Sequence, residues 1–237
     1  MRVKILGTRG EIEPSAPKHS NHSGILIDNK MMFDLGEEKF LREKPNCIFI
    51  THLHPDHAFF ARRPITPPAP SCLKRGIKIF APEKYAGFPQ IKIAKRINKI
   101  NGYKITAIPT IHSLHVKSCA YFIEKGGKKI LYTGDMIWIK KTYHHFLKNL
   151  DAVITEGSFI KKGGMVRRGK TTRRIFGHNG IPDLIKFFSK FTKQIILVHF
   201  GSWFYKDADG AKKKIKKLGK IYETEMNIGY DGMKTSI

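Results

Sequence analysis

The fold is decided by one stretch of sequence, Thr51-His52-Leu53-His54-Pro55-Asp56-His57. It directly follows the apolar run Cys47-Ile48-Phe49-Ile50, which predicts a buried strand. In an extended loop, side chains two residues apart point the same way, so His52 and His54 can converge on one metal ion. The chain turns near Pro55, which lets Asp56 and His57 face a second ion. Imidazole and carboxylate groups are ligands that zinc, iron and manganese accept.

Three further candidate ligands also follow apolar strands. They are His112 after residues 105–111, Asp135 after residues 130–134, and His199 after residues 195–198. A single histidine at such a position is more often structural, but together with the first cluster these residues favour a metal site with two ions. One ion is assigned His52, His54 and His112, the other Asp56, His57 and His199, with Asp135 as the bridge.

The length and the cysteines limit the kind of protein. A chain of 237 residues suits a single domain, here residues 1–237, with a sizeable core. Its apolar runs are too short to span a bilayer, and the N-terminus lacks a signal-peptide layout, so no membrane association is expected. Three widely spaced cysteines, Cys47, Cys72 and Cys119, argue against a disulfide framework and favour the cytoplasm. The oligomeric state stays open, and a homodimer is one option.

The net charge of +25 exceeds what solubility requires, and it favours a polyanionic partner, either nucleic acid or a nucleotide. The alternative is a genome or a hot habitat that favours lysine. Residues 157–177 are rich in glycine and basic, and we expect them to form a phosphate-gripping flap over the cleft rather than a solvated loop. The candidate substrate-binding residues in this flap are Lys161, Lys162, Arg167, Arg168, Arg173 and Arg174.

Periodicity and turn signals predict a mixture of strands and helices. Strands are expected at 2–6, 23–28, 31–34, 47–50, 77–81, 104–108, 120–124, 129–132, 152–155 and 194–198. Helices are expected at 37–42, 143–150, 181–191 and 207–218, and residues 221–237 are expected to be one more strand and a surface tail. Because strands come first in runs and then alternate with helices, we expect two packed sheets with helices outside.

The order and spacing of the candidate ligands resemble those of the metallo-β-lactamase superfamily over nearly the whole chain. The matching residues are residues 51–57, His112, Thr133-Gly134-Asp135 and His199. This resemblance implies an α/β fold, a four-layer αββα sandwich with a two-metal site at one edge of its sheets. The expected cofactors are two divalent ions, zinc first, with manganese and iron as alternatives.

Further stretches resemble the branch that contains the tRNA 3′-processing nucleases (ribonuclease Z) and their phosphodiesterase relatives. They are Leu6-Gly7-Thr8, Thr155-Glu156-Gly157-Ser158-Phe159, Gly177-His178-Asn179-Gly180 and Val198-His199-Phe200-Gly201-Ser202. The resemblance implies that Glu156 and His178 form a proton-donating pair. Thr155 and Asn179 depart from the pattern of that branch. Only residues 113–134 lie between two of the ligands, so the long tRNA-gripping arm that many ribonuclease Z enzymes carry there has no room.

The sequence therefore predicts a phosphodiesterase or nuclease that acts on RNA, DNA or a nucleotide-like ester. Two ions can share a water and lower its pKa toward neutrality, and the resulting hydroxide would attack phosphorus. Asp56 would orient that hydroxide and accept its proton, and His178 would protonate the leaving oxygen. Two alternatives stay open: a thioester or lactone hydrolase of the same fold, and a nucleic-acid-binding protein with a vestigial metal site.

Overall fold

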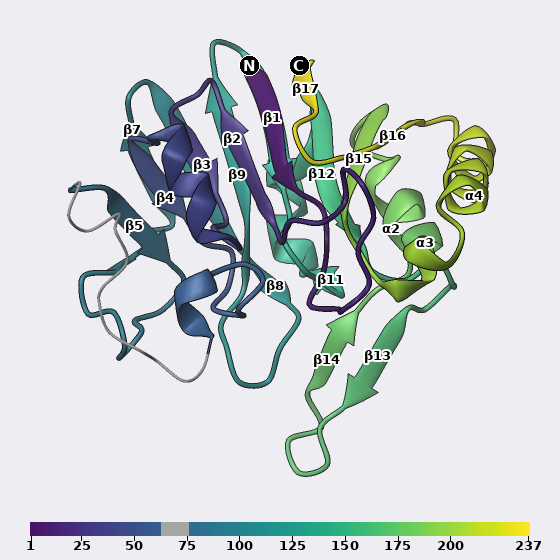
Figure 1. Cartoon of the computed structure of the whole chain (residues 1–237), viewed down its shortest axis with the longest axis horizontal. Coiled ribbons are helices and arrows are strands. Elements are labelled where there is room, and N and C mark those ends of the chain that lie inside the picture. The colour runs from purple at the N-terminus through teal and green to yellow at the C-terminus, as the bar shows by residue number, and fades with distance from the viewer. Residues whose placement is uncertain (63–75) are drawn as a thin grey trace.

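Two stacked β-sheets form the body of the protein (Figure 1), as seen in a computed structural model that describes residues 1–62 and 76–237. The strands of the first sheet are β1 (Arg2–Gly7), β2 (Gly24–Ile27), β3 (Met31–Phe33), β4 (Cys47–Phe49), β5 (Lys78–Ala81), β6 (Lys92–Ile93) and β17 (Lys234–Ser236). Their order across the sheet is β17-β1-β2-β3-β4-β5-β6, and β3 to β6 run parallel to one another.

The second sheet is also mixed. Its strands are β7 (Ile97–Ile100), β8 (Tyr103–Ile111), β9 (Cys119–Lys125), β10 (Lys128–Tyr132), β11 (Trp138–Ile139), β12 (Ala152–Gly157), β15 (Gln194–Phe200) and β16 (Glu225–Ile228). Their order is β11-β8-β9-β10-β12-β15-β16, with β7 paired to β8, and β10, β12, β15 and β16 run parallel.

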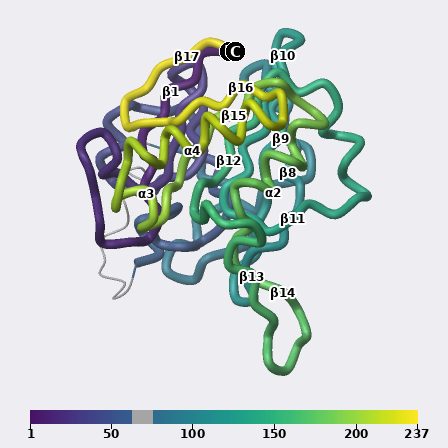
Figure 2. The backbone as a smooth tube through the Cα atoms, turned by 90° about the vertical axis from the view of Figure 1, so that its right-hand side faces the viewer, coloured from purple at the N-terminus to yellow at the C-terminus, as the bar shows by residue number. Residues whose placement is uncertain are grey.

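Helices cover the outer faces of the two sheets (Figure 1). The α-helices are α2 (Ile181–Phe188), α3 (Ser202–Lys206) and α4 (Ala208–Ile221), and they lie beside the second sheet. The 3-10 helices are η1 (Glu38–Glu43), η2 (Phe59–Ala61) and η3 (Lys141–Leu147). A separate hairpin of β13 (Met165–Arg168) and β14 (Ile175–His178) protrudes from the body (Figure 2).

Alternation along the strands explains the layers, because consecutive apolar side chains point to opposite faces. Ile25 and Ile27 pack between the sheets, whereas Leu26 packs outside them against Phe40 of η1. The same rule places Ile154 between the sheets. Strands that are buried on both faces read as continuous apolar runs. The predicted αββα sandwich is confirmed.

The structure differs from the sequence prediction in four segments. The helices expected at 37–42 and 143–150 are short 3-10 helices, a form that proteins use for short connecting segments. The expected surface tail instead adds β17 to the first sheet, with Ser236 paired to Arg2. The flap expected at 157–177 contains the β13–β14 hairpin.

The two cysteines in the described part of the chain, Cys47 and Cys119, are buried and free. Burial raises the pKa of each thiol to about 12, so neither is a reactive thiolate at neutral pH. Cys72 lies outside the described residues. No helix among residues 1–62 and 76–237 is both long and apolar enough to cross a membrane.

Asp28, in the turn between β2 and β3, ties the two sheets together. It accepts hydrogen bonds from the hydroxyl of Tyr103 at 2.6 Å, from Nζ of Lys125 at 3.1 Å and from the amide of Arg2 at 2.8 Å. Burial alone would raise the pKa of this carboxyl, but the Tyr103 hydroxyl, the Arg2 amide and the Lys125 ammonium together lower it to about 2. The ionised form is therefore stabilised by folding.

We expect Asp28→Asn to lower the melting temperature at pH 7 by about 2–4 °C. A depressed pKa contributes stability above the ordinary value of 3.8 and loses that contribution as the pH falls through about 2. The difference in stability between the variant and the parent, measured by thermal or urea unfolding, should therefore be constant above pH 4 and shrink toward pH 2. Asp209→Asn, at an 86% exposed side chain, is the control, and an equal gap at both pH values would contradict the prediction.

Candidate metal centre

The loop after β4 is held in place by the carboxylate of Asp34, which follows β3 and is fully buried. Its oxygens accept hydrogen bonds from the amide of Thr51 at 2.7 Å, from Nδ1 of His57 at 2.7 Å and from the hydroxyl of Tyr132 at 2.8 Å. The Nδ1–H of His57 is thereby occupied, which leaves Nε2 to face the centre. Asp34 is not among the residues predicted from the sequence, although it follows the apolar run 31–33 in the way that the other candidates follow theirs.

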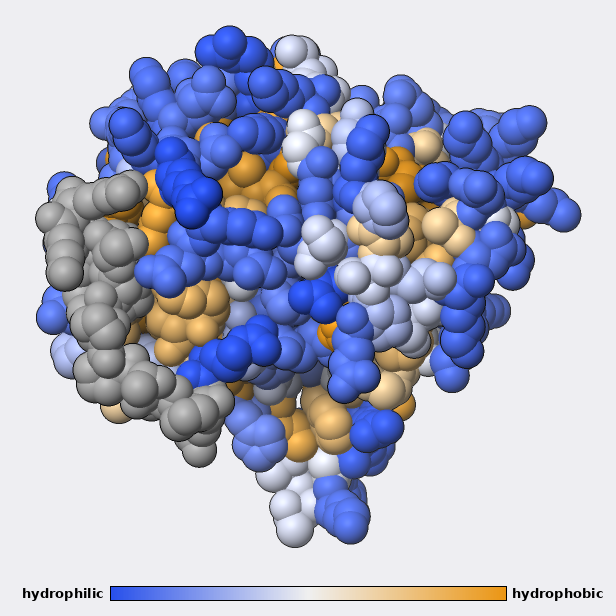
Figure 3. All heavy atoms as spheres, in the orientation of Figure 1, coloured by the Kyte–Doolittle hydropathy of each residue, from blue (hydrophilic) through white to orange (hydrophobic). Residues whose placement is uncertain are grey.

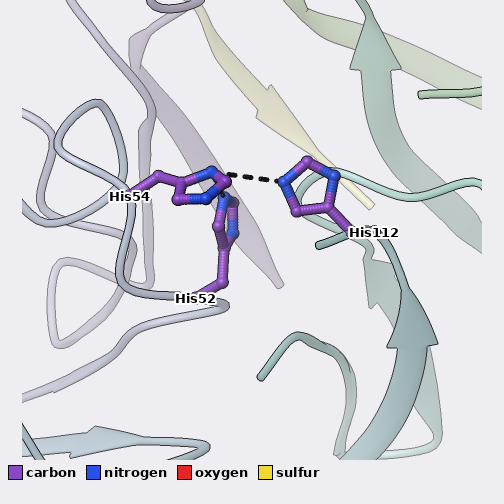
Figure 4. Close-up of side chains that lie close together, drawn as sticks. All are labelled: His52, His54 and His112. Atoms are coloured by element: carbon purple, nitrogen blue, oxygen red, sulfur yellow. Dashed lines mark hydrogen bonds between the residues drawn. The ribbon is translucent and has the colours of Figure 1, made fainter. Parts of the chain in front are cut away.

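His52, His54 and His112 form the first of two ligand groups, with their ligand atoms within 4.8 Å of one another. Figure 4 shows the three rings pointing toward each other, two from the loop after β4 and one from the end of β8. Nδ1 of His54 lies 3.1 Å from Nε2 of His52 and 3.3 Å from Nε2 of His112. Nδ1 of His112 donates to the carbonyl oxygen of Gly177 at 3.0 Å, which fixes the ring.

Burial keeps these three imidazoles neutral, which is the form that binds metals. It lowers the pKa of His54 to about 4, and it lowers the pKa of His52 well below the ordinary value, in both cases assisted by neighbouring histidines. Burial also lowers the pKa of His112.

Asp56, His57, Asp135 and His199 form the second group, and all four side chains are buried. Oδ2 of Asp56 lies 2.8 Å from Nε2 of His199. Burial would raise the pKa of Asp56, but the nearby His57 and His199 lower it, so the carboxylate is ionised. His199 adopts a left-handed backbone conformation with φ of 53°, a strained geometry for a residue with a Cβ that is common at functional sites.

Asp135 lies between the two groups. Its Oδ1 is 3.3 Å from Nε2 of His57 and 3.2 Å from Nδ1 of His199. Its Oδ2 is 3.8 Å from Nε2 of His52 and 3.8 Å from Nε2 of His112. Each oxygen thus faces a different group, which is the arrangement that the bridging assignment predicts.

The donor set fits divalent cations. Oδ1 of Asp135 is buried without a hydrogen-bond partner, and such an atom is costly unless a cation or a donor meets it. Three carboxylates, those of Asp34, Asp56 and Asp135, are buried beside the imidazoles of the two ligand groups, where their negative charge favours a cation. All seven side chains assigned as ligands from the sequence come together here, and their role as ligands stays a prediction.

Glu156 and His178 form a pair beside this centre. Nδ1 of His178 lies 2.8 Å from Oε2 of Glu156, and Oε1 of Glu156 accepts the amide of Met136 at 2.6 Å. His178 also forms a third potential ligand group with His112 and Asp135, although its Nδ1 is 3.8 Å from Oδ2 of Asp135. Burial would lower the pKa of His178, but the charges of Glu156 and Asp135 raise it to about 9.

A cavity of about 320 Å³ opens onto the centre. Polar side chains from both groups and His178 of the pair line it, together with apolar ones from neighbouring loops, β13 and α3. The former are His54, Asp56, Asp135, His178 and His199, and the latter include Ile12, Phe159, Met165 and Trp203. Substrate would therefore meet the ligands and His178 on the same side.

The predicted substrate-binding residues lie farther out than expected. All six are exposed, and they lie on the β13–β14 hairpin or the segment that leads into it (Figure 1). None of them is among the described residues that line the cavity, whereas the ends of the hairpin, Met165 and His178, do line it. Hydrophilic side chains cover much of this face of the molecule (Figure 3). Their contact with substrate stays a prediction.

Comparison with known proteins agrees with this fold. The family described as the β-lactamase superfamily domain matches residues 32–200. The chain belongs to the metallo-β-lactamase superfamily. The metallo-β-lactamase fold protein YhfI from Bacillus subtilis is 19% identical, with a TM-score of 0.69 over 99% of this chain and 98% of that chain. A comparison with curated proteins finds no match.

Two other solved structures are similar over the full length of this chain. A diphosphatase from the PhnP family is 14% identical, with a TM-score of 0.64 over 100% of this chain and 97% of that chain. The short form of human tRNase Z is 18% identical, with a TM-score of 0.61 over 100% of this chain and 99% of that chain. Superfamily membership and the buried His/Asp cluster, which is consistent with a binuclear site, make this chain a metal-dependent hydrolase of the metallo-β-lactamase fold.

We expect Asp34→Asn to weaken zinc binding by about 10–100-fold, because the amide cannot hold both the Thr51 amide and the His57 ring as the carboxylate does. The zinc dissociation constant would be measured by competition with a chelator, and circular dichroism would verify that the variant is folded. Asp28→Asn is the matched control, since it removes a carboxylate with a tyrosine partner away from the centre. Equal zinc affinity in the two folded variants would contradict the role of Asp34.

Proposed function

We propose that this protein is a metal-dependent phosphodiesterase that cleaves nucleic acid or a nucleotide-like phosphodiester, with zinc as the first expectation and manganese or iron as alternatives. The observation that carries the proposal is the Glu156–His178 pair. Glu156 occupies Nδ1 of His178 and is itself fixed by the Met136 amide, so Nε2 is the nitrogen left to serve a substrate in the cavity. A histidine held in this way is suited to donate a proton to a leaving group.

The chemistry of the leaving group makes this pair informative. Cleavage of a phosphodiester expels an alkoxide, which is a strong base and needs a proton as it departs. Hydrolysis of a thioester expels a thiolate, whose conjugate acid has a pKa of about 8.5, so it leaves without help. A buried carboxylate that positions a histidine therefore supports an oxygen leaving group, as in a phosphodiester or a lactone, over a thiolate.

The other residues have separate tasks in this proposal. The ions, when bound, would activate water and offset negative charge that grows on the phosphoryl oxygens. Asp56 lines the cavity, is kept ionised by His57 and His199, and would accept the proton that the water loses. Asp34 would hold the loop of residues 51–57 still during these steps.

Charge and similarity support the same substrate class. The net charge is +25, and the protruding hairpin carries exposed arginines, which favours a polyanion. The similar structures named above include a diphosphatase and a tRNase Z. Residues 113–134 form only a loop and the β9–β10 hairpin, so the substrate is not gripped by an arm inserted there.

We expect His178→Ala to lower kcat about 100- to 10,000-fold on a dinucleoside phosphate, with zinc content unchanged. The loss should be much smaller on bis-p-nitrophenyl phosphate, because p-nitrophenolate leaves without a proton. Glu156→Gln should act in the same direction with a smaller effect. His145→Ala, at an exposed histidine of η3, is the matched control and should leave both rates unchanged.

Three results would count against this proposal. An equal loss of kcat on the dinucleoside phosphate and on bis-p-nitrophenyl phosphate would show that His178 is not the proton donor. Loss of zinc in His178→Ala would make it a ligand. Zinc-dependent hydrolysis of a thioester or a lactone, with no turnover of either phosphodiester, would favour the carbonyl-hydrolase alternative.

A further inference from the structure

A second cavity of about 610 Å³ lies beside the metal centre. Its walls come from segments far apart in the sequence: the chain after β5, the chain between β6 and β7, strand β8, η3 and the loop 113–118. Arg174, the residue before β14, completes the lining. The cavity is thus a property of the folded chain and not of one loop.

The cavity carries an excess of unpaired positive charge. Arg96, Lys117 and Arg174 line it from three different segments, and all three are exposed. None of them has an ion-pair partner within residues 1–62 and 76–237, although the guanidinium of Arg96 lies 5.7 Å from the centre of the Phe146 ring. The single carboxylate of the lining, Glu83, accepts the backbone amide of Lys117 at 2.8 Å.

The rest of the lining suits a nucleotide. The hydroxyl of Ser113 accepts the amides of His115 and Val116, which leaves its O–H to donate to a phosphate or sugar oxygen. The hydroxyls of Thr110 and Ser118 donate within the protein, to Oγ of Ser118 and to the carbonyl of Thr110. The half-buried ring of Tyr143 offers a surface on which a base can stack. Cations and an aromatic ring in one groove are the combination by which proteins bind single-stranded nucleic acid.

The position of the cavity relates it to the centre. His112 and Ser113 are neighbours in sequence, yet the former belongs to the first ligand group and the latter lines the cavity. Strand β14 joins the two regions from the other side, because Gly177 donates its amide to the carbonyl of His112 at 2.7 Å. Arg174 precedes His178 by four residues, which is about 13 Å along an extended strand.

We propose that this cavity binds backbone phosphates of a single-stranded nucleic acid a few nucleotides away from the bond that is cut. The inference rests on the proposed function and narrows it, because a mononucleotide or a small diester would fill only the cavity at the metal centre. A strand that passes His178 and reaches Arg174 enters the cavity that Arg96 and Lys117 also line. The substrate is then an oligonucleotide or a longer strand.

The test compares two double variants that each remove two positive charges. Arg96→Ala/Lys117→Ala removes two positive charges from the cavity lining, and Lys213→Ala/Lys214→Ala removes two exposed lysines of α4 as a matched control. Binding of a fluorescein-labelled 12-nucleotide single-stranded 2′-O-methyl phosphorothioate RNA to the zinc-loaded proteins would be followed by anisotropy. Hydrolysis of bis-p-nitrophenyl phosphate would be measured in parallel.

We expect the cavity variant to bind the 12-mer at least about tenfold more weakly than the parent, and the control variant to bind within about twofold. The log–log salt slope of the cavity variant should be shallower by about 1.4, since two phosphate contacts on a single strand are lost. Its turnover of bis-p-nitrophenyl phosphate should equal that of the parent, because neither residue lies in the cavity at the metal centre.

Unchanged binding in the cavity variant, or an equal loss in both variants, would overturn the proposal. A selective loss of binding in a protein that hydrolyses no phosphodiester would support the cavity and refute the proposed function. A selective loss together with normal hydrolysis of the small diester would support both.

Discussion

The carboxylate of Asp34 anchors the loop of residues 51–57 to both sheets at once. It follows β3 of the first sheet, and it accepts the hydroxyl of Tyr132 from β10 of the second. Burying a charge costs several kcal/mol unless hydrogen bonds replace the lost water, and here the Thr51 amide and the His57 ring supply them. The geometry of every group at this edge depends on that arrangement, since the anchored loop contributes four of the seven predicted ligands.

Sheet topology brings the remaining ligands to the same place. Strands β10, β12 and β15 are parallel, and β8 is antiparallel to β9, which is antiparallel to β10, so β8 runs in the direction of β10. The carboxyl ends of these strands therefore share one edge of the second sheet, as in open α/β sheets that bind ligands at such an edge. His112 and Asp135 follow β8 and β10 there, and His199 is the next-to-last residue of β15, opposite the end of β4.

Much of this arrangement could be predicted from the sequence, because apolar runs that end in histidine or aspartate mark strand ends. The alternation that places Ile25 and Leu26 in different layers follows from the same elementary rule. Asp34 escaped prediction because a lone aspartate after a strand reads as a turn residue, and only the tertiary structure supplies its partners. The pairing of β17 with β1 joins the two ends of the chain, and sequence patterns carry no information about such distant partners.

The basic β13–β14 hairpin shows that amino-acid composition alone does not predict the secondary structure of this segment. Glycine and the basic residues of 157–177 predicted a flap and gave no sign of strands, yet β13 and β14 pair in register and the Gly177 amide of β14 donates to the carbonyl of His112. Gly177 needs to be glycine here, since its φ is 119° and a Cβ would meet the carbonyl oxygen of Met165. The two ends of the hairpin, Met165 and His178, thereby line the cavity at the metal centre, and its exposed arginines lie farther from the centre.

The central claim is that Asp135 bridges two cations held by the two groups. Crystals of the protein loaded with zinc, measured at wavelengths on both sides of the zinc absorption edge, test it most directly. The account predicts two anomalous peaks about 3.5–4 Å apart with the Asp135 carboxylate between them. A single peak, or two peaks of which neither lies within bonding distance of Asp135, would contradict it.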